Sequence, residues 1–436
     1  MCYRGSDIVN WSLTAHRRAE AFEAEFIDEH LEEIGFLLEH RLALLRGATP
    51  NWTDVAPFDA RLFTHLRAFE AYDRRARAQA LARLQAEALA DSPDDNMISG
   101  AAYALGASSD EPALAKQVIS LAAASAEMSM PAWKRGLRMA QGHALDFAMH
   151  DALDSAPAAT MRTFLATLGW RRRLRPDVVL RAFGTWPLKV QEAAAWALAK
   201  VGYTPAAPLL HDALSRHPGS VAIAAALLSI GDNSVLSHVR ALASESVPEK
   251  GSLRLLALGG NVRDADMLVR APHSLEAVTA MGILGSFSLV PELLRHLSVS
   301  AGEPPLCAAA AAALERMSQA GLRETVELTD DSEDKFEPGG SPSSRVMERV
   351  SQDPEHWMAF FGQHQGQFVP GKRYRRGAEF RVESCIDEIA DPASPFSWRH
   401  DAADEWRLRT KHVTDFEPEA VINSQHQSLQ SMRRAL

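Results

Sequence analysis

Four successive stretches that end on glycine decide the predicted fold: AAAWALAKVG (193–202), AIAAALLSIG (222–231), KGSLRLLALG (250–259) and EAVTAMGILG (276–285). Their glycines follow one another at spacings of 29, 28 and 26 residues. The residues four and one before each glycine are apolar, and these two positions share one face of an α-helix. Glycine readily adopts the left-handed conformation that ends a helix. The pattern therefore predicts a series of short helices, each ended by its glycine.

The same pattern extends beyond these four stretches. Gly106 and Gly169 also follow apolar helical sequence, and alanine often stands five residues before the glycine, where a small side chain permits close helix packing. A second amphipathic run follows the glycine, as in residues 208–210 and 291–294. Two helices of this size cannot bury their apolar faces alone, so successive pairs must stack. We predict an all-α fold, an α-solenoid of short HEAT-like helix pairs. The alternative is an irregular helical domain whose helices merely end on glycine.

The repeat array is expected over residues 96–321, after an N-terminal helical region at 1–95. Within the latter, residues 22–46 predict a long amphipathic helix with Arg41 on its polar side, and residues 57–90 predict a second helical unit. The spacing between Gly106 and Gly169 leaves room for two repeats with a degenerate turn.

Two further regions follow the array. Residues 322–344 are acidic and then rich in Pro, Gly and Ser, which predicts a solvated loop. Residues 345–436 predict a C-terminal helical cap, with helices at 345–361 and 379–390 and a basic turn at 371–377. A cap is expected because the terminal unit of a solenoid must cover an apolar face.

Charge and composition restrict the class of partner. The formal net charge is −10 and the pI is near 5.9, whereas proteins that coat phosphates usually carry positive charge, so we expect no nucleic acid. No stretch approaches the ~18 apolar residues of a membrane span, and no signal-peptide core is present. Cys2, Cys307 and Cys385 are too few and too scattered for a disulfide framework or a zinc site. We expect a cytoplasmic protein in which Cys307, in an alanine-rich helix, is a buried thiol.

Catalytic and metal-binding motifs are weak or missing. His143, Asp146 and His150 share one helical face and are of the residue types that bind zinc or iron, but an Asp146–His150 surface pair is the preferred interpretation. The sequence contains no nucleophile elbow, phosphate loop or dinucleotide-binding motif. We therefore expect no enzyme, metal site or cofactor.

Two short segments are candidates for binding another protein. The first is basic and follows Trp170; its candidate residues are Arg171, Arg172, Arg173 and Arg175. Arginine beside tryptophan can also grip phosphates or stack on bases, but a polar inter-repeat loop or a docking site for an acidic partner fits the net charge better. The second segment contains Trp398 and Arg399, residue types that dominate interface energetics. The alternative is that these two side chains pack the C-terminal cap.

Motifs at both ends of the chain resemble an uncharacterised HEAT-repeat family encoded in bacterial type VI secretion gene clusters. The N-terminal resemblance lies in Phe26-Ile-Asp-Glu-His30-Leu-Glu-Glu33-Ile-Gly-Phe36-Leu and in a DxRLxxHL signature formed by Asp59, Arg61, Leu62, His65 and Leu66. The C-terminal resemblance lies in Pro370-Gly-Lys-Arg-Tyr374 and Phe396-Ser-Trp-Arg399. The acidic insertion near 330–344 departs from the family pattern, as does the poor regularity between Gly106 and Gly169.

This resemblance implies a cytoplasmic accessory role near the secretion machinery and carries over no catalytic residue. The leading hypothesis is a non-enzymatic scaffold or adaptor that holds an effector, spike or tip protein. A cytoplasmic immunity protein against a cognate toxin is one alternative. A HEAT-like enzyme, such as a DNA glycosylase or a bilin lyase, is another.

Overall fold

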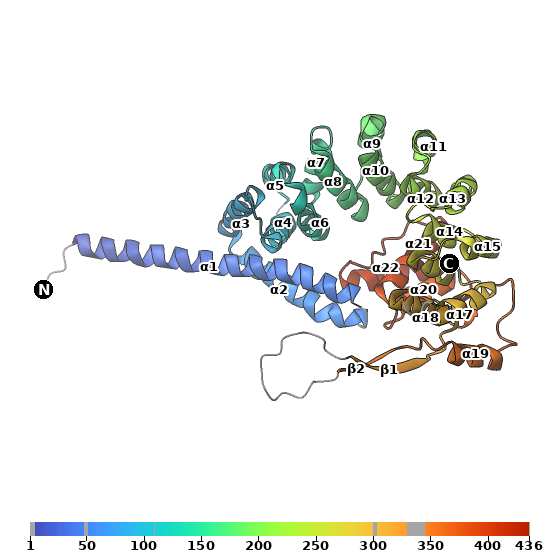
Figure 1. Ribbon diagram of the computed structural model, residues 1–436. Coiled ribbons are helices and arrows are strands. Elements are labelled where there is room, and N and C mark those ends of the chain that lie inside the picture. Colours follow the sequence, from blue (N-terminus) through green and yellow to red (C-terminus); the bar gives the residue numbers. More distant parts are fainter. Residues whose placement is uncertain (1–4, 48–50, 109, 300–302, 329–344, 436) are drawn as a thin grey trace. The chain divides into compact units, whose positions relative to one another are not determined.

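The structure of the protein is a computed structural model that describes residues 5–47, 51–108, 110–299, 303–328 and 345–435. Helices dominate these residues, which confirms the all-α prediction (Figure 1). The chain forms two compact units, each described below by itself. Unit 1 comprises Met1–Gly231, Ile389–Ala403 and Lys411–Leu436, and unit 2 comprises Asp232–Glu388 and Asp404–Thr410. These units do not follow the predicted regions, since the expected C-terminal cap is divided between unit 1 and unit 2.

Unit 1 is built of helices joined by short turns. They are α1 (Gly5–Arg46), α2 (Ala56–Ala71), α3 (Asp73–Ala88), α4 (Asp95–Ser108), α5 (Pro112–Ala124), α6 (Met130–Met139), α7 (His143–Ala152), α8 (Ala158–Trp170), α9 (Pro176–Ala182), α10 (Leu188–Lys200), α11 (Ala207–Arg216), α12 (Val221–Ser229), the first part of α21 (Phe396–Thr410) and α22 (Ile422–Arg434). From α4 to α12, the even-numbered helices pack one against the next, while α3, α5 and α7 form a second row (Figure 1). Successive helical hairpins therefore stack within this unit.

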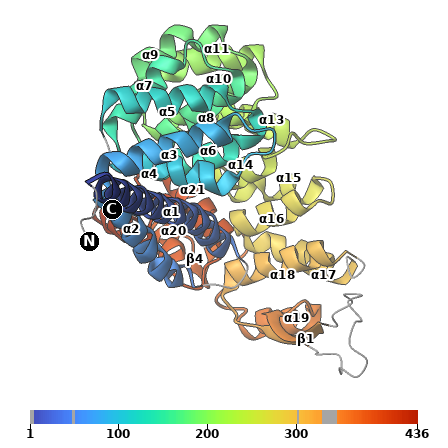
Figure 2. The ribbon, with the colours of Figure 1, turned by 90° about the vertical axis from the view of Figure 1, so that its left-hand side faces the viewer.

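Unit 2 continues the alternation and adds short strands. Its elements are α13 (Leu236–Ala243), α14 (Ser252–Gly259), α15 (Ala265–Arg270), α16 (Leu275–Leu284), α17 (Val290–Val299), α18 (Pro304–Ser318), β1 (Arg323–Leu328), β2 (Arg345–Val350), α19 (Pro354–Gln363), β3 (Tyr374–Arg375), β4 (Ala378–Glu379), most of α20 (Glu383–Ala390) and the end of α21. Here α14, α16 and α18 pack in sequence, and α19 lies against α17 (Figure 2).

The predicted left-handed glycine caps are confirmed at three of six positions. Gly202, Gly231 and Gly285 have φ values of +69°, +96° and +63° and follow α10, α12 and α16. Gly259 instead ends α14 without a positive φ, and Gly106 lies inside α4. The expectation that all six glycines reverse the chain is therefore wrong.

Gly169 serves close packing instead of reversal. A Cβ atom there would lie 2.7 Å from the ring of Trp196 and 2.8 Å from the Cα of Ala197, so α8 and α10 cross too closely for any side chain. The left-handed residue after α8 is Arg172, with a φ of +57°. Gly106 acts in the same way, because its Cβ would lie 2.3 Å from Leu145.

The apolar pattern of the long N-terminal helix is confirmed, except for one residue. Ile27, Leu31, Ile34 and Leu38 are buried where α1 packs on its neighbours. The pattern predicts a polar, exposed position for Arg41, but its side chain is also buried. It is buried because the carboxylate of Asp59 accepts from its Nε at 2.7 Å, which compensates the desolvated charge.

The C-terminal region differs from its prediction in two places. The expected helix over 345–361 is a strand, β2, followed by α19, and β2 pairs with β1 over six residues on each strand. The start of the expected acidic loop therefore forms β1, whereas residues 329–344 lie outside the described residues. The expected basic turn at 371–377 is the β3–β4 hairpin, and its Arg373 and Arg375 are buried.

These two arginines hold the interior of unit 2 together. Arg373 donates to the carbonyl of Leu284 and Arg375 to that of Ile283, so both satisfy the C-terminal end of α16. Both also pair with Glu405, at 2.6 and 2.7 Å. Burial would raise the pKa of Glu405, but Arg373, Arg375 and Arg409 outweigh that effect and lower this pKa to about 2. The basic turn is therefore a buried ionic network.

Residues 411–420, here named the strap, cross the ends of the stacked helices in unit 1. Lys411 lies against Gly231 and Val413 against Gly202, at the ends of α12 and α10. Further along the strap, Glu417 and Glu419 form ion pairs with cations from α1, α6, α10 and the turn after α8. The strap therefore meets the helices in reverse chain order.

Candidate functional site

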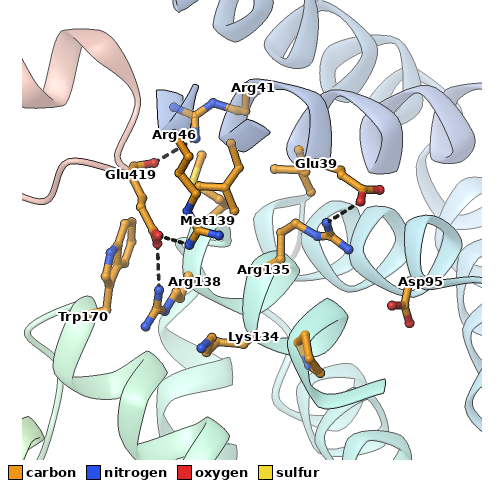
Figure 3. Close-up of a pocket in the computed structure, with 13 residues that line it drawn as sticks. Glu39, Arg41, Arg46, Asp95, Lys134, Arg135, Arg138, Met139, Trp170 and Glu419 are labelled. Atoms are coloured by element: carbon orange, nitrogen blue, oxygen red, sulfur yellow. Dashed lines mark hydrogen bonds and ion pairs between the residues drawn. The ribbon is translucent and has the colours of Figure 1, made fainter. Parts of the chain in front are cut away.

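A cavity of about 330 Å³ opens in unit 1 between α1, α6 and the strap (Figure 3). Its volume lies in the lower part of the range typical of ligand sites. Leu38, Leu42, Pro131 and Met139 supply apolar lining, and the ring of Trp170 forms part of the wall. The remaining lining side chains are charged.

Positive charge predominates in the lining. The cations are Arg41, Arg46, Lys134, Arg135 and Arg138, and the carboxylates are Glu39, Asp95 and Glu419. Five cations and three carboxylates leave a formal excess of two positive charges. Since Asp59, outside the lining, neutralises Arg41, the local excess is smaller than this formal count.

Glu419 brings the strap into the cavity wall. Its carboxylate accepts from Arg138 at 2.9 Å and forms a second ion pair with Arg46 (Figure 3). Its backbone carbonyl accepts from Arg41 at 2.8 Å. The cavity thus already contains one carboxylate held by several arginines.

Among the cations of the lining, Lys134 has the charge that is least compensated by carboxylates. Within the described residues its ammonium makes no hydrogen bond or ion pair, although the side chain is half-buried. Burial lowers the pKa of Lys134, the charge of Arg138 lowers it further, and Glu419 acts in the opposite direction. The three donors of its ammonium are therefore free for a ligand.

Other lining residues also carry unused donors. In the described part of the chain, the Nε atoms of Arg135 and Arg138 and the Nε1 of Trp170 are buried without a hydrogen-bond partner. Buried donors usually have a partner, so several at one cavity need an explanation. Arg135 does keep a long ion pair of 3.6 Å with Glu39 through its Nη1.

The first predicted partner-binding segment is split by the structure. Arg171 and Arg172 point into ion pairs with Asp146 and Glu417, at 3.1 and 2.7 Å, so they serve the fold. Arg173 and Arg175 are exposed. Of the original arginine cluster, only these two are accessible to a partner.

The second predicted segment is mostly interior. The side chain of Arg399 is buried, with its guanidinium 3.9 Å from the ring centroid of Trp52, and it donates to the carbonyl of Ile389. Its predicted role as a surface hot spot is therefore corrected to a structural one. Trp398 is half-buried.

The expected Asp146–His150 surface pair is also corrected. Both side chains are buried, and the Nδ1 of His150 donates to the backbone carbonyl of Asp146 at 2.6 Å, not to its carboxylate. That carboxylate pairs with Arg171. Across the described ranges, no group of three or more His, Cys, Asp or Glu side chains is placed to hold a metal ion. Cys307 is buried in α18, as predicted.

The N-terminal motif residues contact one another within unit 1. The ring nitrogens of His30 and His65 are 3.1 Å apart, and Arg61 pairs with Glu33 at 3.0 Å. These contacts join α1 to α2. The motif residues that carry the family resemblance thus hold the two helices together, and they lie outside the cavity lining.

Sequence reasoning missed the cavity because its residues come from distant segments. Lys134, Arg135 and Arg138 stand at positions i, i+1 and i+4 of one helix, a signal for a basic face that was visible in the sequence. The contribution of Glu419 had no such signal.

No family model matches the sequence, and no curated protein is significantly similar to it. No helix in the described ranges has the length and apolar character needed to cross a membrane.

Proposed function

We propose that the protein is a non-enzymatic, cytoplasmic adaptor that binds another protein through the cationic cavity of unit 1. The strap carries this proposal, because unit 1 already binds an extended acidic peptide, namely its own residues 411–420. Carboxylates of Glu417 and Glu419 are held there by Lys200, Arg172, Arg138 and Arg46. The same chemistry suits an acidic segment of a partner.

The cavity offers the room that such a segment needs. It lies beside Glu419, and its Lys134 has no partner among the described residues. A carboxylate of the partner would therefore gain charge-assisted hydrogen bonds without displacing the strap. The apolar lining next to it would accept the stem of the acidic side chain.

The resemblance to a family from type VI secretion clusters selects the first partners to test. These are the spike, tip and effector proteins of such a locus. We expect one of them to bind the purified chain in a pairwise assay. Lys134→Glu should weaken that binding by at least about tenfold, which corresponds to a loss of ~1.4 kcal/mol of binding free energy. Since Lys134 makes no contact that the fold requires, this variant should fold normally.

Lys116→Glu is the matched control, because Lys116 is an exposed lysine on α5 and lies outside the cavity lining. It should change the affinity less than about twofold, since isolated surface charges contribute little. Failure of every spike, tip and effector protein to bind would refute the proposed partner. Binding that is equally tight after Lys134→Glu would refute the cavity as the binding surface.

A further inference from the structure

The cavity of unit 1 contains a surplus of hydrogen-bond donors over acceptors. The ammonium of Lys134 and the buried Nε atoms of Arg135 and Arg138 have no partner in the described residues. The three carboxylates of the lining are Glu39, Asp95 and Glu419, and two of these already pair with arginines. The two Nε atoms are closed off from the cavity, so a ligand rich in acceptors would bind through the half-buried Lys134 and the terminal nitrogens of Arg138.

The charge of the lining indicates which acceptor group fits. Because Asp59 neutralises Arg41, the lining keeps an excess of one positive charge, and Lys134 is the cation that makes no ion pair with a carboxylate of the described residues. A phosphate monoester carries ~1.5 to 2 negative charges at neutral pH and three strong acceptor oxygens. Arginine is particularly suited to it, because the planar guanidinium matches the spacing of phosphate oxygens.

The shape of the cavity is compatible with such a ligand. A volume of about 330 Å³ exceeds what a phosphate group alone fills. The apolar side chains of Leu42 and Met139 and the ring of Trp170 line the remainder. Figure 3 shows the charged ends of Lys134 and Arg138 at the side of the cavity that Trp170 and Glu419 border. The organic part of a monoester would therefore contact an apolar wall while its phosphate contacts the cations.

We propose that this cavity is a binding site for a phosphate monoester, carried either by a phosphorylated side chain of a protein or by a small molecule. The inference rests on the proposed function only in that both concern the same cavity. Lys134 and Arg138 bind the phosphate oxygens. Trp170 and Met139 hold the organic group.

Phenyl phosphate is the first probe, measured by isothermal titration calorimetry on the full chain. It is expected to bind one site per chain, and benzoate, with the same ring but one carboxylate, at least about tenfold more weakly. Affinity for phenyl phosphate should fall as the pH drops below ~6, where the monoester loses its second charge. Equal affinity for benzoate, or no binding of phenyl phosphate, would overturn the inference.

Substitutions of single residues test whether phenyl phosphate binds in the cavity. Lys134→Gln should weaken phenyl phosphate binding by about tenfold, whereas Lys116→Gln should leave it unchanged. Loss of affinity in Lys116→Gln equal to that in Lys134→Gln would contradict the assignment.

Two peptides distinguish the sources of the phosphate and separate this inference from the adaptor proposal. One contains phosphoserine and the other contains glutamate at the same position. Tighter binding of the phosphopeptide than of phenyl phosphate supports a protein-borne group, and the reverse order supports a small molecule. If the glutamate peptide binds as tightly as the phosphopeptide, the phosphate inference fails while the adaptor proposal stands. If a secretion partner binds but neither peptide nor phenyl phosphate does, the phosphate inference again fails alone.

Discussion

The ammonium of Lys200 lies 2.6 Å from the carboxylate of Glu417, although 217 residues separate them in the chain. Arg172 contacts the same carboxylate oxygen at 2.7 Å, and all three side chains are largely buried. The strap is therefore fixed to the ends of two stacked helices by charge. This arrangement makes the helical stack of unit 1 depend on residues far beyond the stack in sequence.

Glu417→Gln should destabilise unit 1 strongly. The change leaves the cations of Lys200 and Arg172 buried with less compensation, and breaking a buried ion pair from one side costs about 3 to 5 kcal/mol. Urea unfolding followed by circular dichroism would measure the loss. As a control, Asp212→Asn removes an exposed ion pair with Arg216 and should cost at most about 0.5 kcal/mol. If the two variants lowered the free energy of unfolding equally, the ion pairs of the strap would not stabilise the stacked helices.

Gly169→Ala should also be destabilising, by about 1 to 3 kcal/mol, because the added methyl group overlaps the Trp196 ring and the backbone of α10. Gly184→Ala is the matched control, since nothing lies within 4 Å of a Cβ there. The control should be neutral or slightly stabilising, because alanine restricts the unfolded chain. Thermal unfolding of both variants checks the difference. A neutral Gly169→Ala would mean that α8 and α10 can separate easily.

Stability should decrease as the pH falls from 7 to 5. Burial lowers the pKa of His150 below its ordinary value of 6.5, despite the hydrogen bond to the Asp146 carbonyl. The folded chain therefore binds this proton less readily than the unfolded chain, so the stabilisation is complete above pH ~6.5 and is lost as the pH falls below it. His30 and His296 contribute with the same sign, since burial lowers their pKa values too.

His150→Gln should reduce this pH dependence, because glutamine can accept from the backbone N–H of Arg175 but does not titrate. Urea midpoints at pH 7 and pH 5 measure the effect. His143→Gln, at an exposed position on the same helix, should retain the full decrease. An unchanged pH dependence in His150→Gln would contradict the assigned role of the buried ring.

The stability of unit 2 at low pH should depend on the protonation of Glu405. Its pKa is lowered from 4.5 to about 2, so its carboxylate contributes about 3 kcal/mol above pH ~4.5 and loses this contribution as the pH falls towards 2. Glu405→Gln should remove that contribution at neutral pH. Hydrogen exchange in the β3–β4 hairpin would report the loss, and unchanged protection there would contradict the network. Glu379→Gln, which alters an exposed ion pair with Lys372, is the control.

The sequence predicted the stacked helices well because their determinants are local. Apolar spacing and alanine before the turn depend on residues within one helix, so the buried face of α16, with Met281 and Leu284, was correctly placed. Glycine was a less reliable indicator of chain reversal, because it occurs in these helices for two different reasons. It reverses the chain at Gly202 and permits close helix contact at Gly169, and only the neighbouring helix distinguishes these.

The burial of charged residues was the feature that the sequence predicted least well. A run of basic residues is typical of a solvated surface, yet Arg373 and Arg375 are buried, because Glu405 and free helix-end carbonyls lie opposite them. The cavity was missed for a related reason. Its cations lie on α1 and α6, and the strap brings Glu419 to them from 281 residues beyond Arg138.

Acylation of lysines, read out by mass spectrometry, tests the central claim that an anionic group enters the cavity at Lys134. The chain is treated with a low dose of acetic anhydride, with and without the phosphoserine peptide or the secretion partner that binds it. The account predicts that the ligand reduces modification of Lys134 several-fold and leaves Lys116 unchanged. Equal modification of Lys134 in the presence and absence of a bound ligand would contradict it.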